Sequence, residues 1–249
     1  MTFLDQLSPG RKLLWLDYTE YAGALLAGGT VPWLDVAALL AWQRKAQALL
    51  RSDVIGLPVG VVCAAWTGAH QALCAAMAAK ARTLFPLKTL LADSGLCAHL
   101  VELAEGLRAS FTETPLALVC PSPRRWAAQA YAQAHRETPD IDEDDADSAA
   151  VLIADFLRLF GESGVDVLLI EDACGGIEEQ PMLNVAAHYR WEIARHMPQA
   201  LSVGAVAAAV VPETYWSGNA EAAIDGPRYA RIPSDARPEA VLERLSLLR

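Results

Sequence analysis

The sequence predicts an α/β fold, a (β/α)8 barrel of the TIM type that is either complete or shortened. Short apolar segments typical of buried parallel strands alternate with longer segments of helical periodicity, as in repeated strand–helix units. The chain has 249 residues, 53% of them hydrophobic, which is enough for one large core. No Gly-x-Gly-x-x-Gly motif follows a strand and no Gly-Lys-Ser/Thr motif occurs, so an open, doubly wound sheet would lack its usual ligand. We therefore expect a single barrel domain over residues 1–249.

The first two strand–helix units lie in the N-terminal third of the chain. The apolar residues 12–16 end at Asp17 and predict the first strand, and residues 36–50 have helical periodicity. Residues 53–63 are rich in β-branched side chains and predict the second strand. The alanine-rich residues 70–81 predict the helix that follows it.

The central segment predicts the next units. Ser94 can cap a helix that carries four leucines on one face, and residues 115–120 follow as a buried strand. Residues 124–135 predict another helix. The acidic residues 138–147 predict a solvated loop, because their carboxylates repel one another and the glycine and terminal Glu of a calcium loop are missing.

The C-terminal part begins with the clearest strand. A helix over residues 148–160 leads into residues 165–170, an entirely buried strand by its composition. A helix that opens at Pro181 is expected to end near Met197, and residues 201–211 predict a strand after it.

The strand count decides whether the barrel closes. Residues 228–232 predict a short last strand, and Pro238 opens a final helix. These strands number six, so closure to eight needs two more, for which residues 83–91 and 213–224 are the candidates. An incomplete barrel would expose a sheet edge, which proteins cover. We therefore expect a homo-oligomer or a subunit of a larger complex.

Composition excludes several kinds of partner. The net charge of -10 opposes a phosphate backbone, and no basic stripe offsets it, so no nucleic-acid partner is expected. The longest apolar stretch, residues 205–211, is too short for a membrane span, and the first residues lack the pattern of a secretory signal. Five widely spaced cysteines without a Cys-x-x-Cys pair are expected to be reduced. These features predict a cytoplasmic protein that binds a small molecule.

Polar side chains follow four of the predicted strands. The carboxyl ends of barrel strands meet on one face, where the active sites of such barrels lie. The candidates for this face are Asp17, Tyr18 and Glu20, then Cys63, Trp66 and His70, then Ser122, Arg124 and Arg125, and finally Glu171, Asp172 and Cys174.

Glu171 and Asp172 are the candidates for catalysis. A pair of acids directly after an apolar strand has no role in covering the core. Glu171 could be a general base or a metal ligand, and the alternative is that it caps the glycine turn that follows. Arg124 and Arg125 open a helix and could hold a carboxylate or phosphate, or could pair with nearby acids at an exposed helix end.

Aromatic and histidine side chains give weaker signals. Trp66 and Trp216, on predicted loops, could stack on a planar ligand. His70 could lie at the mouth or cap a helix, whereas His188 and His196 are interpreted as surface residues of one helix. The remaining tryptophans interpreted as packing residues are Trp15, Trp33, Trp42, Trp126 and Trp191.

Residues 156–177 resemble the central segment of the uroporphyrinogen decarboxylase superfamily, in which a helix leads through Ala-Gly-Ala-Asp into a strand that ends in Phe-Asp-Ser. Residues 115–131 and 13–23 resemble two further segments of that family, and together the three cover about half of the chain. The superfamily includes cobalamin-associated methyltransferases and is similar to the barrel of cobalamin-independent methionine synthase. The resemblance implies a (β/α)8 barrel, with Glu171 at the position of the family's strand-end aspartate.

Departures from the family's motifs narrow the function. The decarboxylases carry two arginines after the first strand, where this chain has Asp17 and Glu20. The late Gly-His segment is also absent. Negative charge would oppose an anionic porphyrinogen, so decarboxylation is disfavoured.

The methyltransferase branch remains the main hypothesis. It implies transfer of a methyl or other one-carbon group, with folate or corrinoid as the donor. The branch's His-x-Cys zinc motif is missing, but zinc could assemble from side chains brought together by the barrel. Those candidates are Cys63, His70, Cys120 and Cys174. Two alternatives stay open: cysteines that pack as small hydrophobic residues, and a non-catalytic binding protein or partner subunit.

Overall fold

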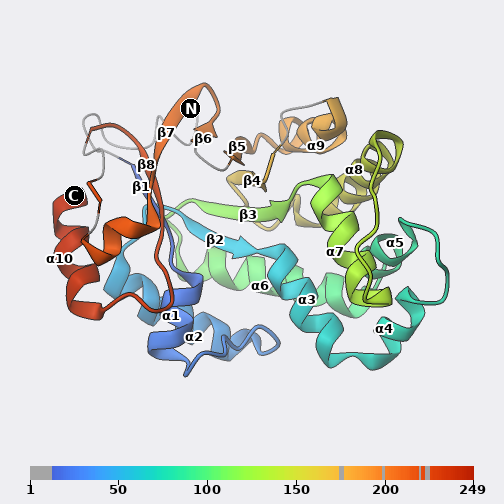
Figure 1. Cartoon of the computed structure of the whole chain (residues 1–249), viewed down its shortest axis with the longest axis horizontal. Coiled ribbons are helices and arrows are strands. Elements are labelled where there is room, and N and C mark those ends of the chain that lie inside the picture. The colour runs from blue at the N-terminus through green and yellow to red at the C-terminus, as the bar shows by residue number, and fades with distance from the viewer. Residues whose placement is uncertain (1–12, 174–176, 198–199, 219, 222–224) are drawn as a thin grey trace.

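The computed structural model describes residues 13–173, 177–197, 200–218, 220–221 and 225–249. Within them, eight strands form one sheet in the order β1-β8-β7-β6-β5-β4-β3-β2, curled into a nearly closed barrel with helices around it (Figure 1). The α/β barrel prediction is confirmed. The strands are β1 (Leu14–Asp17), β2 (Ile55–Pro58), β3 (Leu116–Pro121), β4 (Val167–Glu171), β5 (Glu192–Met197), β6 (Ala200–Val203), β7 (Val206–Val211) and β8 (Arg228–Arg231).

Helices follow most of the strands and cover the outside of the sheet. The α-helices are α1 (Thr19–Leu26), α2 (Val36–Leu50), α3 (Val59–Ala69), α4 (Gln71–Met77), α5 (Phe85–Leu91), α6 (Ser94–Ser110), α7 (Pro123–His135), α8 (Glu143–Leu157), α9 (Gln180–Tyr189) and α10 (Pro238–Leu248). Short 3-10 helices are η2 (Arg158–Phe160), η3 (Ile177–Glu179) and η4 (Glu213–Ser217). Among the described residues no single helix is long and apolar enough to cross a membrane, although α3 and α4, bent by 106°, pass that test of length and composition as a pair.

Strands β1 and β2 face each other without forming a ladder, and we call this place the seam. Side chains from the segment before β2 bond to the backbone of β1 instead. Asp53 Oδ2 accepts from Leu14 N at 2.7 Å, and Ser52 Oγ accepts from Leu16 N at 2.9 Å. In return, Asp53 N donates to Leu14 O at 3.0 Å. The amides that β2 would have bound are thus satisfied by two side chains.

The sequence of β2 explains why the seam has no ladder. Ile55 N donates to Pro115 O at 2.9 Å, so alternate residues of β2 bond to β3. The intervening residues, Gly56 and Pro58, turn their backbone groups toward the seam. Pro58 has no N–H to donate, and proline in a strand is found at edges for this reason. The barrel therefore has eight strands but only seven ladders.

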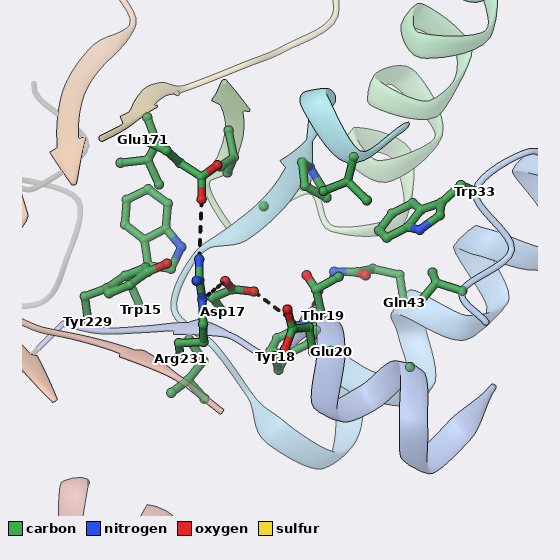
Figure 2. Close-up of a pocket in the computed structure, with 18 of the residues that line it drawn as sticks. Trp15, Asp17, Tyr18, Thr19, Glu20, Trp33, Gln43, Glu171, Tyr229 and Arg231 are labelled. Carbon is green, nitrogen blue, oxygen red and sulfur yellow. Dashed lines mark hydrogen bonds and ion pairs between the residues drawn. The ribbon is translucent and has the colours of Figure 1, made fainter. Parts of the chain in front are cut away.

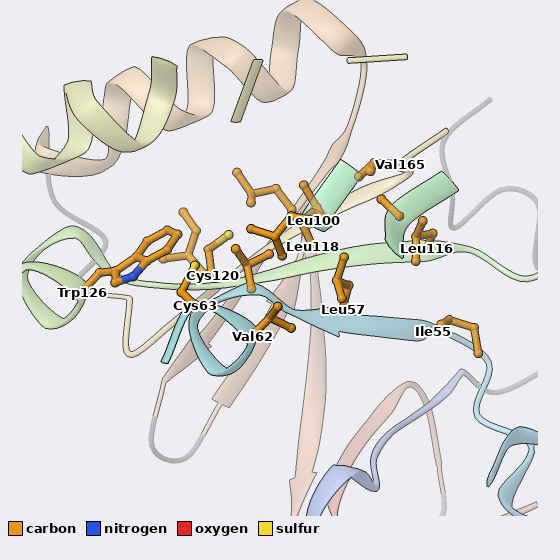
Figure 3. Packing of buried hydrophobic residues seen from close by; sticks show 14 of the residues in the cluster. Ile55, Leu57, Val62, Cys63, Leu100, Leu116, Leu118, Cys120, Trp126 and Val165 are labelled. Atoms are coloured by element: carbon orange, nitrogen blue, oxygen red, sulfur yellow. The ribbon is translucent and has the colours of Figure 1, made fainter. Parts of the chain in front are cut away.

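The side chains of the sheet alternate between two apolar layers. On β4, Val167 and Leu169 point into the barrel, where they pack with Trp15 and Tyr229. Leu168 belongs to the larger layer between the sheet and the helices, part of which is drawn in Figure 3. The last inward position of β4 is Glu171, so a carboxyl group lies where the apolar lining of the barrel ends.

The second strand–helix unit differs from its prediction. We expected residues 53–63 to be one strand, but β2 ends at Pro58 and α3 begins at Val59. Val59, Val61 and Val62, which predicted a strand, lie in the first turns of α3, and the burial of Val59 and Val62 outweighs their β propensity. Cys63 therefore lies inside a helix and not at a strand end.

Aspartate side chains cap the N-termini of α6 and α8. The predicted cap of α6, Ser94, is its first helical residue, and Asp93 accepts from Leu96 N at 2.7 Å instead. The predicted loop over residues 138–147 ends earlier, because α8 begins at Glu143. Asp142 caps it, and acids in a first turn are stabilised by the helix dipole.

The two strands that the predicted count of six lacked are β5 and one strand of the β6–β7 hairpin. The helix expected to end near Met197 ends at Tyr189, and the next residues form β5 beside β4. The single strand expected over residues 201–211 is two strands, β6 and β7, joined at Gly204 with φ 55°. Residues 83–91, proposed as a strand, form mostly α5.

Candidate functional site

A cavity of about 360 Å³ opens at the carboxyl end of β1, beside the seam (Figure 2). We call it the seam cavity. Its walls come from β1 and the start of α1, from β2, and from the ends of β4 and β8. The residues that define it are Trp15, Asp17, Tyr18, Glu171, Tyr229 and Arg231.

An ion cluster lies on one wall of the seam cavity. Arg231 of β8 donates from Nε to Asp17 Oδ2 at 2.9 Å, and its Nη2 lies 3.4 Å from Glu171 Oε1 (Figure 2). Asp17 also accepts from Thr19 N at 3.3 Å through its other oxygen. One guanidinium thus joins carboxylates from the first and fourth strands, and β8 places it between them.

Glu171 is the titratable group with the clearest functional character. Its side chain is 20% exposed, and burial raises the pKa of its carboxyl above the usual value. Asp17 and Asp172 raise this pKa further, whereas Arg125 and Arg231 lower it. Glu171 can therefore hold a proton at a higher pH than an ordinary glutamate and can still ionise beside two guanidinium groups.

His196 and Tyr229 stand next to this carboxyl. His196 of β5 is the register partner of Glu171, and its ring centroid lies 4.8 Å from that of Tyr229. Burial and the nearby Arg231 lower the pKa of His196, so the imidazole is neutral at neutral pH. Burial raises the pKa of the Tyr229 phenol, which keeps its proton. The cluster therefore combines a neutral imidazole, a phenol and a carboxyl group.

The first predicted trio is brought together at the cavity. Asp17, Tyr18 and Glu20 all line it. The buried Tyr18 hydroxyl accepts from Gln43 Nε2 at 2.8 Å and lies 3.3 Å from Gln47 Oε1, which fixes the ring against α2. Glu20 is exposed in the first turn of α1.

The two predicted arginines go to different places. Arg125 forms an ion pair with Asp172, which has φ 50°, and lies at the edge of the seam cavity. Arg124 points elsewhere: it donates to Ile141 O and its Nη2 lies 3.6 Å from Glu178. The predicted joint anion site is therefore not formed, because both guanidinium groups bond to acceptors within the chain.

Trp66 and His70 do not reach the cavity. Their rings stack on each other at 4.1 Å, and His70 Nδ1 lies 2.7 Å from Trp66 O. Ser122 is buried, and its N–H donates to Glu171 O at 2.9 Å, so it supports the strand end. Trp216 is buried as well and donates from Nε1 to Arg231 O at 2.7 Å. Neither of these tryptophans lines the seam cavity.

Among the described residues, the predicted zinc ligands do not form a metal site. Cys63 and Cys120 lie buried between the sheet and the helices (Figure 3), and burial raises the pKa of both thiols. Zinc binds thiolates, which this environment opposes. His70 is exposed, and Cys174 lies outside the described residues. Within the described part of the chain, no group of three His, Cys, Asp or Glu side chains could hold a metal ion.

Several cavity residues were not predicted as such. Trp15 and Trp33, interpreted as packing residues, line the cavity, as do Tyr229 and Arg231. A period of two over the predicted last strand would have indicated Tyr229 and Arg231, because both lie on one face of β8. His196 could not be found in this way, because its strand was predicted as a helix.

The fold and the cavity define the chain as an α/β barrel with a charged pocket at the carboxyl ends of its strands. Comparisons with protein-family models, with curated proteins and with solved structures find no match.

Proposed function

We propose that the protein is an enzyme that acts on a small organic molecule in the seam cavity, with Glu171 as its general acid or base. One observation carries this proposal: a largely buried carboxyl group with a raised pKa lines a cavity at the end of a barrel strand. Such groups mark functional sites, since a general acid or base works best with a pKa near the ambient pH.

The neighbours of Glu171 support both of its protonation states. Protonated Glu171 would give its proton to the bound molecule, and Arg231 and Arg125 would stabilise the carboxylate that remains. Asp17 would act as a positioning residue, because it holds the guanidinium of Arg231 from the other side. The neutral His196 beside Glu171 could accept a second proton.

Transfer of a methyl or other one-carbon group is a proposal within this class. It rests on the resemblance to the uroporphyrinogen decarboxylase superfamily, and in such a reaction Glu171 would take the proton of the accepting group. Zinc activation of a thiol by Cys63 and Cys120 has no support from the site, because both thiols lie on the far side of the strands.

A non-catalytic binding protein is the second candidate. It is favoured by the pairing of both arginines at the cavity, Arg231 with Asp17 and Glu171, and Arg125 with Asp172. Ion pairs that are complete without a ligand can serve structure alone. The two candidates differ in whether a bound molecule is changed.

Incubation with a metabolite extract, followed by mass spectrometry, separates these two candidates. The wild-type protein should deplete at least one compound and form a new one, and Glu171→Gln should lose this conversion. Glu102→Gln, which makes the same change at an exposed position of α6, is the matched control and should behave as wild type. Conversion by Glu171→Gln at the wild-type rate would refute the assignment of Glu171.

A further inference from the structure

A second cavity, of about 440 Å³, lies next to the seam cavity between α3 and α7. We call it the helix cavity. Most of its wall is apolar. Small residues (Gly60, Ala64 and Ala130) contribute to it together with Leu90 and Trp126. Gln133 of α7 donates to Ala64 O at 3.1 Å and holds the two helices at this spacing.

The two cavities share a wall and meet at the ion cluster. The residues that line both are Pro58, Val61, Val119, Arg125 and Glu171. Val61 is 46% exposed, which leaves an apolar surface at the junction of the two cavities. A molecule with its polar group at Glu171 could therefore extend an apolar part into the helix cavity.

The charged side chains of the seam cavity indicate whether the polar group of the bound molecule is a cation or an anion. Three acids line it, Asp17, Glu20 and Glu171. Arg231 pairs with two of these acids, Asp17 and Glu171, and Arg125 pairs with Asp172, so acids outnumber arginines around the cavity. The chain also carries a net charge of -10, which repels anions and attracts cations from solution.

The aromatic residues of the seam cavity also favour a positively charged group. Trp15, Trp33, Tyr18 and Tyr229 contribute to its walls. Aromatic faces attract ammonium groups, and acids beside them supply hydrogen-bond acceptors. A carboxylate or phosphate head would instead meet more acids than arginines, and both arginines already form ion pairs.

We propose that the two cavities form one site for an amphipathic amine, with the ammonium group beside Asp17, Glu20 and Glu171 and the apolar tail between α3 and α7. This inference rests on the proposed function, since it names the substrate class of the same site. A hydrocarbon tail suits the helix cavity because its lining offers few polar partners.

Calorimetry with butylamine, hexylamine and octylamine tests the tail. Affinity should rise by about fourfold for each added methylene that is buried. Ala64→Trp fills the helix cavity from an exposed position of α3, so it should remove this gain in affinity with chain length. Ala69→Trp, also exposed on α3 but away from both cavities, is the control. An affinity that does not depend on chain length would overturn the proposal.

Alkanols and alkanoates of the same lengths test the head. The amines should bind more tightly than both, and Glu20→Gln should weaken only the amines, by about two- to fivefold as for other exposed ion pairs. Glu102→Gln should have no effect. Tighter binding of the alkanoates, or no binding of any amine, would show that the head is not an ammonium group.

The outcomes also separate this inference from the proposed function. Amines that bind as described but are never converted would contradict the enzymatic role of Glu171 and leave the ligand class standing. The opposite outcome is conversion of a molecule without an apolar tail that is lost in Glu171→Gln but unaffected by Ala64→Trp. It would support the enzymatic role of Glu171 and contradict the proposed ligand class.

Discussion

The environment of Glu171 destabilises the ionised form of its carboxyl group, on balance, relative to the protonated form. Burial, Asp17 and Asp172 together outweigh Arg125 and Arg231, so the folded chain holds the proton of Glu171 more tightly than the unfolded chain does. Stability must then fall as the pH rises from the ordinary pKa of glutamate through the raised pKa of Glu171. The group that would serve catalysis therefore costs stability at neutral pH.

Glu171→Gln should reveal this cost. Glutamine resembles the protonated carboxyl, so the variant should be at least as stable as wild type at neutral pH and should lose this advantage at acid pH, below the ordinary pKa of glutamate. Urea unfolding at several pH values measures both curves. A variant that is less stable than wild type at neutral pH would indicate a structural role for the Glu171 carboxylate.

Arg231→Met should destabilise the fold, because it leaves Asp17 and Glu171 without their shared guanidinium. We expect a loss of about 1.5–3 kcal/mol at neutral pH, the range for hydrogen bonds to charged groups. The loss should shrink as the two carboxyls take up protons. Arg158→Met, which breaks an exposed pair with Asp155, is the control and should cost less than about 1 kcal/mol.

A single site residue could be predicted from the sequence only where the strand that carries it, and the end of that strand, were predicted correctly. Asp17 and Glu171 were predicted because each ends a strand whose apolar run is unmistakable in the sequence. Arg231 was missed although its strand was predicted, because the period of two that places it on one face with Tyr229 was not applied to so short a strand. Trp66 was expected at the mouth of the barrel, but the strand before it ends at Pro58 and leaves it on α3. His70 lies between α3 and α4, at the helix-cap position that was its alternative.

At the scale of elements, the seam is the least regular part of the barrel. Its hydrogen bonds use side chains of Ser52 and Asp53 in place of a strand backbone. Each such bond can be removed by one substitution, whereas a ladder bond cannot. The seam is therefore the strand junction most open to mutational test.

Ser52→Ala should remove the acceptor of Leu16 N within a buried setting. An unsatisfied buried amide costs about 1–3 kcal/mol, so the midpoint of urea unfolding should shift accordingly. Ser148→Ala, at an exposed position of α8, should change stability by no more than about 0.5 kcal/mol. Equal effects of the two variants would mean that water replaces the lost bond and that the seam is open to solvent.

Asp142→Ala tests the cap that starts α8 within the acidic segment. Loss of the side-chain bond to Asp145 N should cost about 1 kcal/mol in the free energy of unfolding. Asp142→Asn keeps an acceptor and should retain most of the stability. A neutral Asp142→Ala would show that burial of α8 alone fixes where the helix begins.

At the scale of the whole molecule, the barrel could be predicted but its closure could not. Six strands followed from apolar runs between helices, and their parallel order follows from the helical crossovers. The hairpin of β6 and β7 breaks this pattern, because residues 201–211 were predicted as one strand and only Gly204 marks the turn that divides them into two antiparallel strands. With eight strands present, an exposed sheet edge no longer argues for an oligomer, and a homo-oligomer or complex stays a prediction for light scattering.

The pairing of β1 with β8 also sets an order of events in synthesis. Asp17 and Arg231 are 214 residues apart, and β8 supplies the ladder that holds β1 in the sheet. A chain emerging from the ribosome cannot form this ladder until its last strand has been made, and closing so large a loop is slow. A nascent chain that has not yet reached β8 thus has no complete cavity, and ligand binding becomes available only after β8 has been made.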